Sequence, residues 1–306
     1  MLKTLPIAVA LLLLVGFFVI PSYAVDDVSW SVDMEASKTE AKTSEKDIFL
    51  YFTGSDWCPP CIYMKDKIFS TPAFRSSVPE EFVLTEIDFP RTFQLPPAQV
   101  KQNDTLAELY GVDYFPTILL ADAEGRPYAS MREMMVSPQE YVDYVRERKS
   151  IRTERDRAFA EAELLVGSAK ASVLDRGLQA MGMEIALQYY PEQVNEVVTL
   201  DQDNALGLRD GYRSELTAMA LDAATQEAIT VYQAGYLEDA VMRFERIFVQ
   251  FQPQGNEAQI LRATLGQIYQ ELGDKDKARL AFQQAIDDAP NSAVVPQIQT
   301  LLSRVK

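Results

Sequence analysis

The stretch Phe52-Thr53-Gly54-Ser55-Asp56-Trp57-Cys58-Pro59-Pro60-Cys61 contains the only two cysteines in this chain of 306 residues. When a Cys-x-x-Cys sequence opens a helix, both sulfurs lie at the helix N-terminus. Free N–H groups and partial positive charge there stabilise a thiolate on the first cysteine. The spacing therefore predicts a disulfide that opens and closes. Cys58 is the expected nucleophile, and Cys61 is the expected resolving thiol.

Two other interpretations of this pair are a zinc site and an inert structural bridge. A zinc site needs about four ligands, whereas the chain has no histidine and no third cysteine. A disulfide that closes so short a loop stabilises a fold little by the chain-entropy argument. The sequence therefore favours a redox pair over both alternatives, and it predicts neither a metal nor a cofactor.

Composition limits the classes of protein that this chain can belong to. The length suggests two domains, at about 150 residues each, and the apolar content of 47% suits packed cores. The net charge is −16, so no basic surplus is present to neutralise nucleic-acid phosphates or anionic lipids. We expect no nucleic-acid partner.

Residues 1–24 have the pattern of an export signal. Lys3 precedes an apolar run over residues 5–20, and Ser22 and Ala24 form a small-x-small end suited to cleavage after Ala24. An uncleaved membrane anchor is the alternative, although this run is shorter than the roughly 20 residues of a membrane span. We expect a periplasmic or secreted protein.

The following residues, to about position 150, alternate between strand and helix patterns. Strands are predicted at residues 28–32, 47–52, 81–89, 115–120 and 128–131. Helices are predicted at residues 34–45, 58–69, 70–74 and 99–110, and from Ser137 onward. This order predicts an α/β domain over residues 25–150, with a mixed central sheet flanked by helices.

Two motifs in this part resemble the thioredoxin superfamily. Trp57-Cys58-Pro59-Pro60-Cys61 matches its W-C-x-x-C motif, and Tyr114-Phe115-Pro116-Thr117, about 55 residues later, matches its cis-proline strand. A lone Cys-x-x-Cys is a weak signal, but the two motifs together are a strong one. Asp88-Phe89-Pro90-Arg91 adds a narrower similarity to exported bacterial thioredoxin-like proteins.

The resemblance implies a thiol–disulfide oxidoreductase that acts on protein disulfides. Cys58 and Cys61 would be its catalytic residues and its redox-active disulfide. Pro116, preceded by a cis bond, would lie beside the pair. Trp57 would form an apolar platform, and the backbone of Phe115 would receive an extended substrate. The implied partners are protein dithiol or disulfide substrates and an upstream thiol redox partner.

One family feature is missing from this sequence. Thioredoxins keep a buried aspartate beneath the second cysteine, but Tyr51 and Phe52 occupy the matching positions. The proton acceptor for Cys61 is therefore expected to be water or Asp56. Leu84 stands where the family places a lysine. We therefore assign neither the aspartate's role nor the lysine's role to a residue of this chain.

Residues 151–306 show only helix patterns and predict an all-α domain. A segment over residues 146–157, dense in both charge signs, predicts a solvated helix. Further helices are predicted at residues 158–165, 172–190, 193–198, 207–221, 223–234, 239–251, 257–272 and 276–289.

A repeat within these helices resembles the tetratricopeptide pattern, most clearly over residues 221–253 and 259–292. Gly235 and Gly273 are equivalent in the two units and lie 38 positions apart. The positions that carry the better match are Leu265, Gly266, Tyr269, Leu272, Gly273, Asp274, Ala278, Phe282, Ala285 and Pro290.

The repeats predict either a groove for a protein partner or a packing and dimerisation module. Two hypotheses for the whole chain follow. The first is an exported oxidoreductase with a partner-binding helical module. The second is an envelope scaffold whose repeats bind a partner and whose cysteine pair is vestigial or regulatory.

Overall fold

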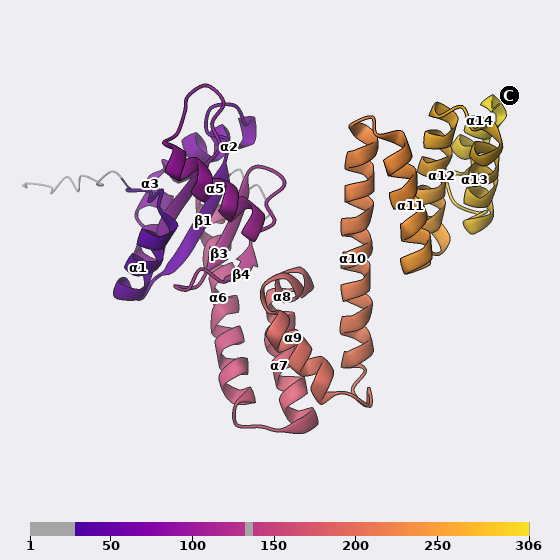
Figure 1. The fold of residues 1–306 in the computed structure, drawn as a ribbon. Helices are drawn as coiled ribbons and strands as arrows, with labels where there is room; N and C mark the ends of the chain where they lie inside the picture. Colours follow the sequence, from indigo (N-terminus) through magenta and orange to yellow (C-terminus); the bar gives the residue numbers. More distant parts are fainter. Residues whose placement is uncertain (1–27, 132–136, 306) are drawn as a thin grey trace, which may run out of the picture. The chain divides into compact units, whose positions relative to one another are not determined.

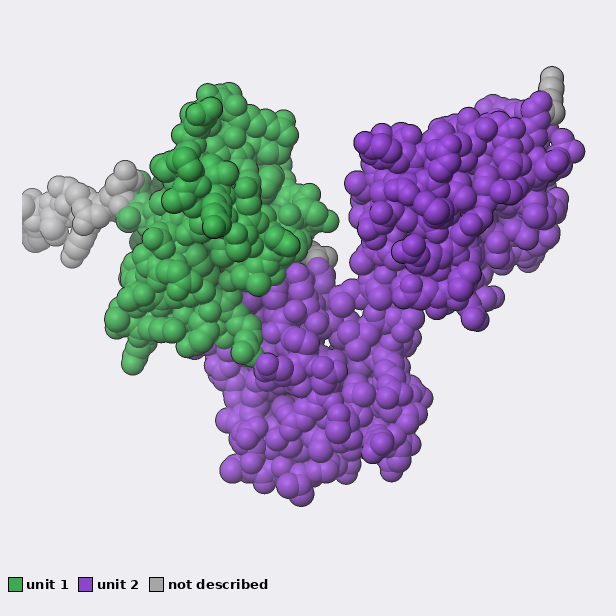
Figure 2. Space-filling model, in the orientation of Figure 1, with its two compact units in different colours: residues 1–126, 130–148 green, residues 127–129, 149–306 purple. Residues whose placement is uncertain are grey.

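The computed structural model describes residues 28–131 and 137–305. The predicted export signal at residues 1–24 lies outside these ranges. No described helix is both long and apolar enough to cross a membrane. The chain divides into two compact units, coloured separately in Figure 2. Unit 1 comprises residues 1–126 and 130–148, and unit 2 comprises residues 127–129 and 149–306.

A mixed four-stranded sheet has the order β2-β1-β3-β4. The strands are β1 (Asp47–Thr53), β2 (Phe82–Asp88), β3 (Thr117–Ala121) and β4 (Pro127–Ser130). β1 pairs with β2 in parallel and with β3 antiparallel. Every residue of β1 is buried, as its unbroken apolar run predicts for a central strand. The C-terminal end of β1 leads directly into the cysteine motif.

Helices lie around this sheet (Figure 1). They are α1 (Met34–Ser44), α2 (Pro59–Met64), α3 (Pro72–Arg75), α4 (Val78–Glu81), α5 (Pro97–Leu109) and α6 (Pro138–Ala162), with a π-helix η1 (Lys65–Phe69) continuing α2. An aromatic cluster covers one face of β1, and Phe69 and Phe74 have ring centroids 4.7 Å apart within it. This cluster packs η1 and α3 against Phe49 of β1.

The strand predicted at residues 28–32 is wrong. Ser31 forms only an isolated parallel bridge with Thr85. Two residues later, the Asp33 carboxylate accepts hydrogen bonds from the N–H groups of Glu35 and Ala36 and begins α1. The N-cap turns the chain away from the sheet before a ladder can extend.

Unit 2 is helical. Its helices after α6 are α7 (Gly167–Met181), α8 (Met183–Tyr189), α9 (Pro191–Leu200), α10 (Leu208–Gln233), α11 (Leu237–Phe251), α12 (Gly255–Glu271), α13 (Lys275–Asp288) and α14 (Val295–Arg304). The helix predicted at 172–190 is interrupted at Gly182, whose φ of 87° suits glycine. The helices predicted at 207–221 and 223–234 are instead one helix, α10, because no breaker separates them.

The segment predicted to be a solvated helix is only partly solvated. Arg155 on α6 is 5% exposed. Its guanidinium donates to the Tyr190 hydroxyl and to the Asp156 carboxylate, and it lies 5.8 Å from the centroid of the Tyr128 ring. Charge density along the sequence did not reveal this buried position, because the two tyrosines that Arg155 contacts, Tyr128 and Tyr190, lie elsewhere in the chain.

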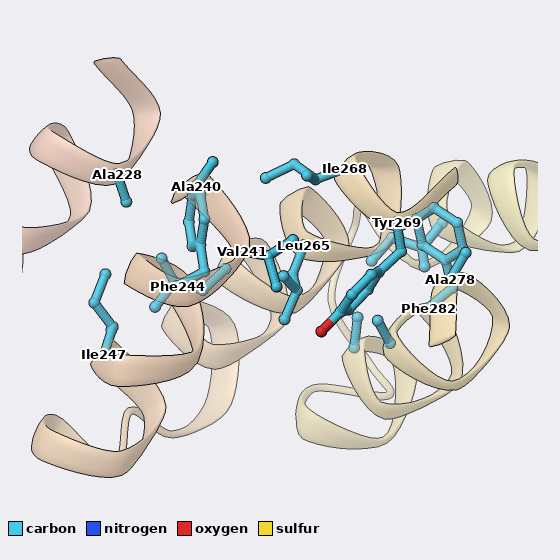
Figure 3. Close-up of a cluster of buried hydrophobic side chains, with 14 of the residues drawn as sticks. Ala228, Ala240, Val241, Phe244, Ile247, Leu265, Ile268, Tyr269, Ala278 and Phe282 are labelled. Carbon is cyan, nitrogen blue, oxygen red and sulfur yellow. The ribbon is translucent and has the colours of Figure 1, made fainter. Parts of the chain in front are cut away.

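The last helices of unit 2 share one apolar core (Figure 3). α12 and α13 contact each other closely at Gly266, where an added Cβ would lie 2.7 Å from the Phe282 ring. Phe282 and Phe244 are both fully buried. The tetratricopeptide assignment of these helices remains a prediction.

Candidate redox site

Cys58 and Cys61 form a disulfide at the start of α2. Cys58 is the N-cap of this helix, and the N–H of Cys61 donates to Cys58 Sγ over 3.3 Å. Pro59 and Pro60 occupy the first turn, where a helix does not need their N–H groups. The sequence predicted this placement. A thiolate on Cys58 would have a backbone donor and the positive end of the helix within reach.

Trp57 is held beside the pair by close backbone packing. Its indole Nε1 donates to the carbonyl of Phe89 over 2.7 Å. A Cβ at Gly54 would lie 2.5 Å from the indole ring, so only glycine leaves room for the ring at this point. Gly54 also accepts the N–H of Cys58 at 2.9 Å. This glycine therefore orients both the tryptophan and the first cysteine.

The predicted substrate-binding residues meet in one aromatic group. The rings of Trp57 and Phe115 are 5.9 Å apart in an edge arrangement. Phe89 stacks on Phe115 at 5.1 Å. The Phe115–Pro116 peptide bond is cis, and both of its residues are half-buried.

Sequence reasoning assigned no role to two residues of this group, Phe89 and Arg91. The Arg91 guanidinium lies 3.5 Å from the centroid of the Trp57 ring, a cation–π contact. The signal was present in the Asp88-Phe89-Pro90-Arg91 similarity, which marked the segment without indicating its contacts.

Asp56 binds the segment that carries Arg91. Its carboxylate accepts hydrogen bonds from the N–H groups of Arg91 at 3.0 Å and Thr92 at 2.6 Å, and from the Thr92 hydroxyl. The Thr92 hydroxyl is the main cause that lowers the pKa of Asp56 below its ordinary value, and these backbone donors add to it. A carboxylate with a lowered pKa accepts protons poorly. The expectation that Asp56 takes the proton of Cys61 is therefore not supported.

Tyr51 occupies the position beneath Cys61. Its hydroxyl donates to the Cys61 carbonyl over 3.2 Å and accepts from the Thr53 hydroxyl over 2.9 Å. Burial raises the pKa of Tyr51 far above its usual range. The group is a neutral phenol at physiological pH, so it positions the helix backbone and is not a base.

Asp88 fixes the loop between β1 and the cysteines. Its carboxylate accepts the N–H of Ser55 at 2.9 Å and the Ser55 hydroxyl at 2.6 Å. Its carbonyl accepts the side-chain amide of Asn103, a residue of α5 that is 1% exposed. These bonds connect the cysteine loop, the end of β2 and α5 into one framework.

Within residues 28–131 and 137–305, no three or more acidic, cysteine or histidine side chains are grouped to hold a metal ion. Both cysteines are instead used in the disulfide.

The sequence model of the family described as a thioredoxin-like domain matches residues 34–149. Residues 34–149 form a thioredoxin-like domain. The predicted superfamily and the predicted mixed α/β architecture, followed by a helical region, are thus confirmed.

Two curated relatives come from Chlamydia pneumoniae. "Disulfide bond reductase DsbH" is 36% identical over 108 residues, which cover 35% of this chain and 64% of the relative. "Thioredoxin-related protein DsbJ" is 25% identical over 101 residues, which cover 33% of this chain and 29% of the relative. The matches thus span less than two thirds of either relative.

A solved structure titled "DsbH Oxidoreductase" is 32% identical, with a TM-score of 0.38. The match covers 40% of this chain and 84% of that structure's chain. Each curated match covers about a third of this chain.

Proposed function

We propose that this chain is an exported thiol–disulfide oxidoreductase that reduces protein disulfides through Cys58 and Cys61. The observation that carries the proposal is the disulfide at the start of α2, within a thioredoxin-like domain. The name of one relative, "Disulfide bond reductase DsbH", favours the reducing direction.

The proposed reaction is a thiol–disulfide exchange. The Cys58 thiolate attacks one sulfur of a substrate disulfide, the substrate bond breaks, and its second sulfur leaves as a thiolate. Deprotonated Cys61 then attacks Cys58 Sγ and releases the first substrate sulfur. The substrate gains two electrons and two protons, and the protein ends as the Cys58–Cys61 disulfide. An upstream thiol partner then reduces this disulfide.

The aromatic group supports a binding role for Trp57, Phe115 and Pro116. An extended substrate would lie against the Trp57 ring and along the backbone that precedes Pro116. Residues 1–24 support export to the periplasm or beyond. We propose that water accepts the proton of Cys61, because Tyr51 is neutral and Asp56 is bound to the segment that follows Pro90.

The helical unit suggests a second function, binding of a partner protein. Large apolar side chains on its surface include Val249, 78% exposed, and Ile260, 60% exposed. The alternative for the whole chain is an envelope scaffold that binds through these helices. Its redox pair would then be vestigial or regulatory.

Serine variants of the two cysteines test the proposal. Cys58→Ser should abolish the protein's catalysis of insulin reduction by dithiothreitol, because this variant lacks the nucleophile. Cys61→Ser should accumulate mixed disulfides, detected by non-reducing electrophoresis. Wild-type turnover by Cys61→Ser would contradict the two-cysteine reaction. Full turnover by Cys58→Ser would contradict the role of Cys58 as nucleophile, and a wild type that does not accelerate insulin reduction would favour the scaffold.

The reduction potential of the pair tests the direction. Trp57 fluorescence can follow equilibration with thiol buffers, and a Trp30→Phe variant removes the second tryptophan. A potential near roughly −270 mV would agree with a reductase. A value near about −120 mV would indicate an oxidant that donates disulfides.

A further inference from the structure

A cavity of about 750 Å³ lies between α5 and the segment that joins β2 to it. This volume is within the range of protein pockets that bind small molecules. Its apolar wall is formed by Phe89, Pro90, Phe93, Leu95, Pro97 and Val100. Phe93 is 49% exposed and Val100 is 42% exposed, so an occupant would remove apolar surface from water.

The cavity continues the candidate redox site through one shared residue, Phe89. The Phe89 ring stacks on Phe115, and its carbonyl binds the Trp57 indole. Phe89 also lines the cavity. A polypeptide joined to Cys58 and lying on Trp57 would therefore pass the cavity entrance.

The cavity wall is fixed before any substrate binds. The Asp56 carboxylate holds the N–H groups of Arg91 and Thr92 on one side. Asn103 bonds the Asp88 carbonyl on the other side. Because these hydrogen bonds already order the cavity wall, substrate binding there costs the protein little conformational entropy.

The charges on the cavity rim favour a basic partner group. Asp104 and Glu108 lie four residues apart on α5, so they share one helix face, and both are exposed. Lys101 is the cation among the exposed lining residues, which leaves the carboxylates in excess. Asp88 also lines the cavity, but its carboxylate is bound to Ser55.

We propose that this cavity binds a large apolar side chain of an extended polypeptide substrate, next to a basic residue, while the cysteine of that substrate is joined to Cys58. This inference rests on the proposed function and adds its substrate class. The protein selects unfolded or extended chains with apolar and basic residues near the cysteine, and it disfavours acidic ones.

Single-turnover kinetics test this substrate class with the full chain. Reduced protein is mixed with a short peptide disulfide that carries Leu and Lys near the cysteine, or with a matched peptide that carries Ser and Glu. Trp57 fluorescence then gives the second-order rate constant. Each constant is divided by that for glutathione disulfide on the same protein, because this small disulfide has no large apolar side chain to place in the cavity.

Two variants alter the cavity wall. Val100→Asn places a neutral polar group at a position already partly in water, and Phe93→Ala shortens an exposed side chain, so neither change disturbs the core. Each should reduce the normalised Leu/Lys rate by about tenfold, the loss typical of one apolar pocket contact. Leu109→Asn is the matched control, because Leu109 is an exposed residue of the same helix that does not line the cavity.

Charge reversal tests the rim. A double variant, Asp104→Lys and Glu108→Lys, should lower the Leu/Lys rate and raise the Ser/Glu rate. Equal normalised rates for the two peptides in the wild type would overturn the inference. An unchanged preference in Val100→Asn and Phe93→Ala would also overturn it. If wild-type protein reduces neither the two peptide disulfides nor glutathione disulfide, the proposed function itself is wrong.

Discussion

At the scale of single residues, Tyr51 shows how a hydroxyl replaces an acid beneath the second cysteine. It donates to the Cys61 carbonyl, which also accepts the N–H of Lys65 where α2 gives way to η1. The Cys61 carbonyl thus accepts two hydrogen bonds at the junction between the α-helix α2 and the π-helix η1. This arrangement supports the helix without placing a charge in the core.

Removing this hydroxyl should cost stability. Tyr51→Phe leaves the Thr53 hydroxyl, itself buried, without its acceptor, so we expect a loss of about 1 kcal/mol in the free energy of unfolding. Urea denaturation followed by fluorescence measures this loss. Tyr114→Phe, at a side chain 52% exposed, is the control and should stay within about 0.5 kcal/mol of the wild type. A Tyr51→Phe protein as stable as the wild type would show that the hydrogen bonds contribute nothing.

Asp56 predicts a pH dependence of stability. The pKa of Asp56 is lower in the folded protein, chiefly because of the Thr92 hydroxyl. The ionised carboxylate therefore stabilises the folded state more than the protonated acid does. The stabilisation is present above the ordinary carboxyl pKa of about 3.9. It is lost as the pH falls through the lower pKa of the folded state.

The test compares wild-type protein with Asp56→Asn at several pH values. The wild type should be more stable near neutral pH, and its advantage should shrink below about pH 4. Asp113→Asn, at an exposed loop position, should change stability little across the same range. An advantage for the wild type that is constant down to acidic pH would contradict the assigned role of the Asp56 charge.

At the scale of secondary-structure elements, caps and breakers explain which predictions succeeded. The strands at β1, β2 and β3 and the start of α2 follow from apolar runs and from prolines that helix N-termini tolerate. The strand at 28–32 failed because a single aspartate, Asp33, begins a helix too soon. The alternation in that segment instead places Trp30 against the aromatic cluster, 5.3 Å from the Phe69 ring.

Two glycines in helices of unit 2 should respond oppositely to the same change. Gly266→Ala would place a methyl group against the Phe282 ring, which is fully buried and cannot yield. We expect a destabilisation of about 1–3 kcal/mol. Gly211→Ala, with open space around its Cβ position in α10, should stabilise by roughly 0.5–1 kcal/mol, because alanine favours the helix.

Chemical denaturation followed by circular dichroism measures both glycine variants. Destabilisation by both substitutions, or by neither, would show that contact between α12 and α13 does not determine the outcome.

At the scale of the whole molecule, the two units have cores of their own and offer separate spectroscopic signals. Both tryptophans of the chain, Trp30 and Trp57, lie in unit 1. All the helices from α7 to α14 lie in unit 2, so unit 2 dominates the far-ultraviolet circular dichroism. A core mutation in one unit should therefore move one signal more than the other.

Phe282→Ala should lower the stability of unit 2 by about 3–5 kcal/mol, the usual cost of deleting a buried ring. The circular dichroism transition should move to lower denaturant concentration, and the tryptophan transition should stay in place. Phe74→Ala, at a fully buried ring of unit 1, should have the reverse effect. Coincident shifts of both signals in both variants would mean that the chain unfolds as one cooperative body.

The sequence alone determined the features that depend on near neighbours. These are the cysteine pair at a helix start, the buried central strand, the proline-containing β3 motif and the helical character of residues 151–306. Apolar runs, helix periodicity and capping residues act over a few positions, so they can be read without a structure.

Only the tertiary structure decided the contacts that join distant residues. Asp56 holds the N–H of Arg91, 35 positions later in the chain. Arg155 is buried beside Tyr190, again 35 positions away. The cavity beside Phe89 exists because the segment after β2 is fixed against α5. No local pattern encodes such pairs, because each depends on where the complete fold brings two separate segments together.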